Sequence, residues 1–77
     1  MKPLILGGMS QVFRKTVGQN VRAFRLRLKL TQEQLAEKAD LHWTYISGVE
    51  RGRYNVSLDS LEALATALGR KPFELLK

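Results

Sequence analysis

The side chains best suited to chemistry lie on one face of a short helix predicted near the middle of the chain. When residues 43–51 are stepped at 100° per residue, Ile46 and Val49 fall on one side. The opposite side carries an indole, two hydroxyls, a bare backbone and a guanidinium, from Trp43, Thr44, Ser47, Gly48 and Arg51. These groups hydrogen-bond and contact apolar atoms, which is the chemistry of a recognition surface. A helix this short is not stable alone, so the rest of the chain must present it.

A second short helix precedes it, joined by a tight turn. Thr31 and Gln34 have the spacing of a capping box, which predicts a helix that begins at Thr31 and ends near Ala39. Asp40 then stands where the chain must turn in a left-handed conformation, which Asp tolerates better than most residues. Leu41 is expected to fill the core at this corner.

An amphipathic helix is predicted over residues 11–28. Apolar residues recur there at intervals of four, four, three and four, at Phe13, Val17, Val21, Phe24 and Leu28. Between Ser10 and Leu30 there are six cations and no acidic residue, a charge equal to the net +6 of the whole chain. This concentration of basic charge favours a polyanion as partner. For Arg14, Lys15 and Arg27, a merely solvated helix face is an open alternative.

The C-terminal part reads as one long and one short helix. Ser57 is a predicted N-cap and Gly69 a predicted C-cap. Pro72 suits the first turn of a final helix that ends at Leu76. The buried stripe of the longer helix is expected to be Leu58, Leu61, Leu64, Ala65 and Leu68.

These elements predict an all-α fold, a compact bundle of five helices without strands. Residues 11–77 are expected to form a single domain, and residues 1–10 a flexible N-terminal arm, for which a minor-groove contact is an open alternative. Three consecutive apolar residues near the start are too few for a signal peptide or membrane span, so we expect a cytoplasmic protein.

Composition argues against several classes. The chain has no cysteine and one histidine, so we expect no disulfide, no metal site and no cofactor. The histidine has no nucleophile arrangement around it and no glycine-rich phosphate loop exists, so we expect no enzyme. The basic charge favours nucleic acid as the polyanion, and nothing indicates a small-molecule effector or a membrane partner.

The stretch from Gln32 to Arg51 resembles the helix-turn-helix of the phage repressor and Cro-type (XRE) DNA-binding family, with a lambda repressor-like fold. Residues 45–52, 55–58 and 61–69 are still more similar to the controller proteins of restriction-modification systems. The resemblance implies an ion pair between Arg25 and Glu50, and a phosphate contact by Gln32. Two departures stand out: Asp40 replaces the turn glycine of the family, and Trp43 stands where many relatives have Arg, Lys or Gln.

The resemblance implies that double-stranded DNA is the partner and that the helix at 43–51 enters its major groove, where each base pair shows a distinct pattern. Predicted base contacts are His42, Trp43, Thr44, Ser47 and Gly48. Predicted backbone contacts are Gln32, Tyr45, Arg51, Arg53 and Asn55. Alternatives stay open for three of them: His42 as a cap or packing residue, Trp43 as surface packing over the preceding helix, and Tyr45 as half-buried filler.

A homodimer on a palindromic operator is expected, because one short recognition helix reads only a few base pairs. Phe73 and Leu76 are the predicted dimer interface; the alternative is that Phe73 closes the monomer core. A second function that can share this fold is that of an antitoxin or bridging module, which binds a protein partner.

Overall fold

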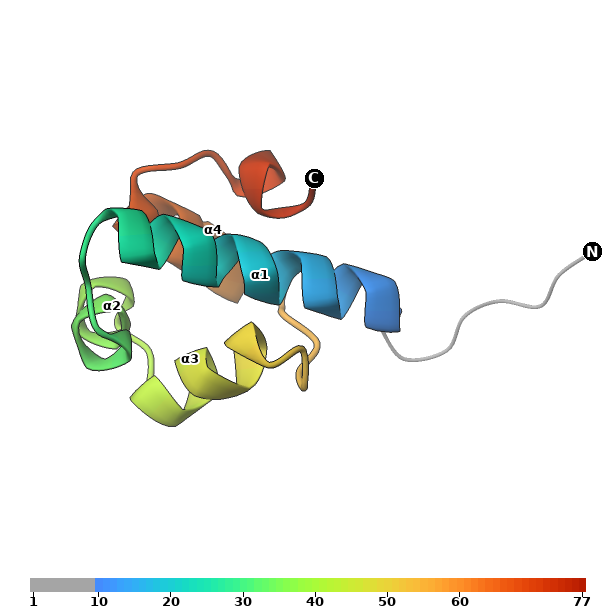
Figure 1. Cartoon of the computed structure of the whole chain (residues 1–77), viewed down its shortest axis with the longest axis horizontal. Helices are drawn as coiled ribbons and strands as arrows, with labels where there is room; N and C mark the ends of the chain where they lie inside the picture. Colours follow the sequence, from blue (N-terminus) through green and yellow to red (C-terminus); the bar gives the residue numbers. More distant parts are fainter. Residues whose placement is uncertain (1–9) are drawn as a thin grey trace, which may run out of the picture.

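Four α-helices and one 3-10 turn make up the part of the chain that the structure, a computed structural model, describes, residues 10–77 (Figure 1). They are α1 (Gln11–Arg27), α2 (Gln32–Ala39), α3 (Trp43–Glu50), α4 (Leu58–Leu68) and η1 (Pro72–Leu75). The prediction of an all-α helix-turn-helix fold is confirmed. The prediction of five helices is wrong, because the last element is a single turn closed by i→i+3 bonds, with the Glu74 N–H donating to the Lys71 carbonyl at 2.9 Å.

The helices begin where the local sequence predicts. The Ser57 hydroxyl accepts from the Ser60 N–H at 3.0 Å, which caps α4. At the start of α2 the Thr31 hydroxyl accepts from the Gln34 N–H at 3.0 Å, and the Thr31 N–H donates to the Gln34 side chain at 2.8 Å. Two orphan donors of α2 are therefore satisfied by the capping box.

The exits of α1 and α2 use residues other than glycine in left-handed conformations. Asp40 has φ 56°, as the turn between α2 and α3 requires, and Lys29 has φ 58° after α1. Such a conformation costs a residue with a Cβ roughly 1 to 2 kcal/mol. Leu41 follows Asp40 and packs, partly buried, against the core.

The core lies between α1 and the other elements. In Figure 1 α1 crosses the middle of the molecule, with α2 and α3 below it, α4 behind it and η1 above. Each element contributes at least one fully buried apolar side chain to this centre: Val17, Val21, Leu35, Ile46, Leu64 and Leu75.

Three residues of the predicted apolar stripes are not in the core. Phe13 is 51% exposed, Leu28 49% and Leu58 82%. The 17 residues of α1 span about 25 Å and the 11 of α4 about 16 Å, so α4 cannot cover the whole length of α1. Leu58 is the first residue of α4 and lies at the same edge as Phe13.

The predicted arm falls on residues 1–9, outside the described part, as does its suggested minor-groove contact. Ser10, also assigned to the arm, caps α1 by accepting from the Phe13 N–H at 3.2 Å. Among residues 10–77 no helix is both long and apolar enough to cross a membrane.

Candidate nucleic-acid interface

α3 is held close to α1 by a glycine. Gly18 is buried in α1, and a Cβ at this position would overlap the carbonyl oxygens of Val49 and Glu50 at the end of α3. Because only a hydrogen fits there, the two helix backbones can touch. We did not predict this contact from the sequence, since a glycine inside an amphipathic helix gives no sign of which neighbour it faces.

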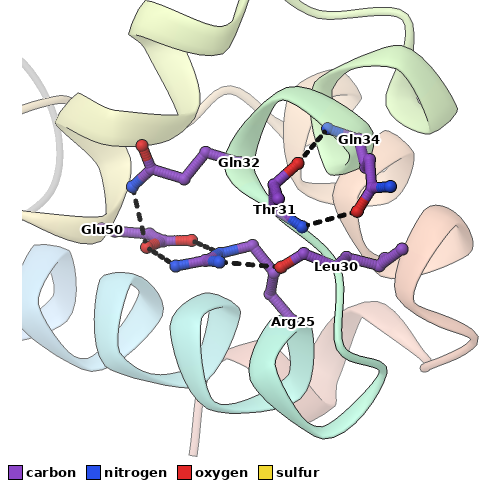
Figure 2. A network of polar contacts seen from close by, with 6 residues as sticks. All are labelled: Arg25, Leu30, Thr31, Gln32, Gln34 and Glu50. Atoms are coloured by element: carbon purple, nitrogen blue, oxygen red, sulfur yellow. Dashed lines mark hydrogen bonds and ion pairs between the residues drawn. The ribbon is translucent and has the colours of Figure 1, made fainter.

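The ion pair implied by the resemblance joins α1 to the end of α3 (Figure 2). Arg25 donates from Nε to Glu50 Oε2 at 2.7 Å and from Nη2 to Glu50 Oε1 at 2.9 Å, while Nη1 donates to the Leu30 carbonyl at 2.8 Å. Arg25 is 7% exposed. The hydrogen bond to Glu50 raises the pKa of Arg25, against the effect of burial, so the guanidinium stays charged.

Gln32 joins α2 to the same carboxylate. Its Nε2 donates to Glu50 Oε1 at 3.1 Å, and Figure 2 shows its side chain reaching across to the end of α3. The structure thus gives the Gln32 amide a partner inside the protein, while the implied phosphate contact stays a prediction. One network of Arg25, Gln32 and Glu50 therefore joins α1 and α2 to the end of α3.

His42 caps α3. Its Nδ1 accepts from the Thr44 N–H at 3.3 Å and lies 2.8 Å from the Thr44 hydroxyl oxygen. The structure therefore shows the capping role that was open in the sequence. A base contact by His42 stays a prediction, and it would have to use the other ring nitrogen.

The outward face of α3 borders a hollow of about 200 Å³, which we call the α3 hollow. Trp43 is 46% exposed at its edge, so its indole is available to a ligand. Arg51 Nη2 donates to Ser47 Oγ at 3.2 Å across one turn of the helix. The residues that line the hollow are Trp43, Thr44, Ser47, Gly48, Arg51, Arg53 and Tyr54.

Gly48 is buried although it lines the hollow, and a base contact at Gly48 stays a prediction. A Cβ on Gly48 would overlap the ring of Tyr54, which lies against the helix at this point. The same ring stacks on Tyr45, with 5.6 Å between centroids and 8° between planes. Tyr45 is half-buried and packs against the core, which agrees with the alternative prediction that it is a half-buried filler. Tyr54 was missed, although an aromatic residue just after a glycine-containing helix was a usable signal.

The exit of α3 carries positive charge. Gly52 turns the chain with φ 72°, the Arg53 N–H donates to the Gly48 carbonyl at 2.9 Å, and the Arg53 side chain is exposed. Asn55 accepts from Arg14 Nε at 3.0 Å, so a cation of α1 lies beside the loop. Among the predicted backbone contacts, Arg51, Arg53 and Asn55 therefore lie together at one end of α3.

The residues predicted for the dimer interface lie away from the α3 hollow. Phe73 is 56% exposed and Leu76 40%, so the alternative in which Phe73 closes the core is wrong. Leu75 closes it instead, and Asn20 of α1 holds the Leu75 carbonyl by donating from Nδ2 at 3.0 Å. Leu76 also borders an apolar groove of about 270 Å³, lined by Phe13, Val56, Leu58, Leu61 and Leu76.

The profile of the family described as Helix-turn-helix matches residues 21–75. The chain belongs to this family, whose members are DNA-binding regulators and not a class of enzymes. It is similar to the control protein C.BamHI of Bacillus amyloliquefaciens, with 49% identity over 69 residues that cover 88% of this chain and 85% of that protein.

Two further relatives agree. The immunity repressor protein of Bacillus phage phi105 is 59% identical over 54 residues, which are 70% of this chain and 38% of the repressor. The crystal structure of the restriction-modification controller protein C.AhdI from Aeromonas hydrophila superposes with a TM-score of 0.78 at 45% identity, covering 80% of this chain and 94% of that one. The chain is a helix-turn-helix transcription regulator similar to restriction-modification controller proteins.

Proposed function

We propose that the chain regulates transcription as a homodimer that binds a palindromic operator, with α3 of each copy in the major groove. The observation that supports this most is the α3 hollow, which is open to solvent and borders hydroxyl, aromatic and guanidinium groups on a helix fixed by the Arg25–Glu50 pair. A major groove about 12 Å wide admits one helix. Trp43, Thr44 and Ser47 then face the base edges.

Phosphate contacts supply most of the affinity in this proposal. Arg51, Arg53 and Asn55 lie at one end of α3, and Gln32 stands in the first turn of α2, where a helix N-terminus favours an anion. Arg14 and Lys15 extend this surface along α1, because Arg14 bonds Asn55 and Lys15 packs against Gly52.

A DNA retardation assay at a series of salt concentrations tests the binding. The logarithm of affinity should fall linearly with the logarithm of salt, at a slope of about −0.9 per neutralised phosphate. Arg53→Gln should make the slope shallower by about one phosphate. Affinity that does not change between low and moderate salt would refute the proposed phosphate surface.

The dimer is proposed to form through the face that carries Phe73, Leu76 and the apolar groove. A twofold axis there would set two recognition helices about 34 Å apart, one turn of DNA, which requires a palindromic site. Sedimentation at micromolar concentration tests it: Leu76→Asp should be monomeric. Leu26→Asp is the matched control, because Leu26 is 51% exposed and lies outside the groove.

A second function rests on the same groove. The exposed apolar side chains Phe13 and Leu58 also suit a heterologous protein, as an antitoxin or bridging module would need. A stoichiometric protein partner that Leu58→Asp releases, with no DNA retardation by the parent chain, would favour that function over operator binding.

A further inference from the structure

Tyr54 lies outside the two helices of the helix-turn-helix, in the connection between α3 and α4, yet its ring belongs to the outward surface of α3. It is 44% exposed and lines the α3 hollow together with Trp43. Its neighbours in the chain, Arg53 and Asn55, are proposed phosphate contacts.

Two independent contacts fix the Tyr54 ring. On one face it stacks on Tyr45, which itself packs against the core. It also covers the backbone of α3 at Gly48, where any Cβ would overlap three of its ring atoms. A glycine inside a helix is less stable there than an alanine. The room it leaves for the Tyr54 ring gives that cost a structural reason.

The hollow beside this ring is lined by both aromatic and polar groups. Its aromatic lining comes from Trp43 and Tyr54, and its polar groups include the hydroxyls of Thr44 and Ser47. In the major groove the apolar feature of the base edges is the C5-methyl group of thymine, which lies beside the O4 acceptor. The hollow, at about 200 Å³, has room for a methyl group and the edge of its ring.

We propose that Tyr54 is a specificity-determining residue, whose ring, fixed on Gly48 and Tyr45, forms with Trp43 a slot for a thymine methyl group. This inference rests on the proposed function, because it requires α3 in the major groove. It assigns Gly48 an indirect part, which is to let Tyr54 lie against the helix.

The test removes one methyl group at a time. A duplex is first selected from a random library with the wild-type chain, and each thymidine in it is then replaced singly by deoxyuridine. At one or more positions in each half-site the affinity should fall about fourfold, the factor expected for one buried methyl group. Tyr54→Phe should keep this fall, because the ring is unchanged.

Tyr54→Ala should bring the ratio of thymidine to deoxyuridine affinity close to one at those positions, and so should Gly48→Ala, because its methyl group displaces the ring. The Gly48→Ala/Tyr54→Ala double variant should lose no more discrimination than either single variant. Leu26→Ala, changed on an exposed part of α1 outside the hollow, is the matched control and should behave as wild type.

The wild-type scan decides the inference without any variant. If a duplex is enriched but no deoxyuridine position costs more than twofold, the methyl slot is wrong while sequence-specific binding stands. A fourfold fall that survives unchanged in folded Tyr54→Ala also overturns it. If no duplex is enriched at all, the proposed function fails and this inference fails with it.

Discussion

Arg25→Met should lower the free energy of unfolding by about 3 to 5 kcal/mol, the cost of removing one partner of a buried ion pair. The change deletes the two bonds to Glu50 and the one to the Leu30 carbonyl. It leaves the Glu50 side chain, which is 3% exposed, with Gln32 as the donor that the structure still shows. A domain of 77 residues is typically stable by about 4 to 12 kcal/mol, so this loss is a large share of the total.

The matched variant separates a stranded charge from a lost favourable bond. Arg25→Met/Glu50→Leu removes both charges and fills the space with apolar side chains, and such replacements are often neutral or stabilising. We expect the double variant to recover at least about 2 kcal/mol of what Arg25→Met loses. Urea unfolding of the four proteins at pH 7, followed by circular dichroism, measures the cycle.

The result that would refute this reasoning is additivity. If the double variant is destabilised by the sum of the two single changes, the cost does not come from leaving a charge buried. A loss below about 1 kcal/mol for Arg25→Met is typical of surface ion pairs. That result would contradict the burial of Arg25, which is only 7% exposed.

Two further predictions concern local structure. Asp40→Gly should raise the midpoint of urea unfolding slightly, because glycine adopts φ 56° without strain although it loses more chain entropy; Glu37→Gly inside α2 should instead cost about 1 kcal/mol. The hydrogen bond from the Lys71 N–H lowers the pKa of Glu74 against the opposing effect of desolvation, and the Arg70 side chain adds to the lowering. Its stabilising contribution is therefore complete above the pKa of the unfolded chain and is lost as the pH falls through the lower folded value. The stability difference between wild type and Glu74→Gln should be constant near neutral pH and shrink in acid, which thermal unfolding at several pH values measures.

The features that the sequence predicted well are local ones. Thr31 and Gln34 cap a helix through atoms three residues apart, so their spacing alone carries the information. The left-handed conformation of Asp40 could also be predicted locally, because a tight turn between two short amphipathic helices leaves few alternatives. The Arg25–Glu50 pair could be placed only through the resemblance to a known family, because 25 residues separate its members.

The features that were missed depend on how elements meet in space. Gly18 fits a carbonyl oxygen of α3, and Gly48 fits the ring of Tyr54, but periodicity says nothing of what faces a glycine. At the end of the chain the apolar residues Phe73, Leu75 and Leu76 are nearly adjacent, and a 3-10 turn with three residues per turn selects Leu75 for the core. The alternative that placed Phe73 in the core was therefore wrong, and Leu75 was not predicted for that contact.

Recognition of DNA by the outward face of α3 is tested most directly by the ratio of affinities for the selected duplex and a scrambled duplex. Fluorescence anisotropy measures this ratio for wild type, Trp43→Ala and Arg53→Ala at one salt concentration. Trp43→Ala should lower this ratio by a factor equivalent to about 1 to 3 kcal/mol, the range for one base contact. Arg53→Ala should weaken binding to both duplexes about equally. A folded Trp43→Ala protein whose ratio equals that of wild type would contradict the account.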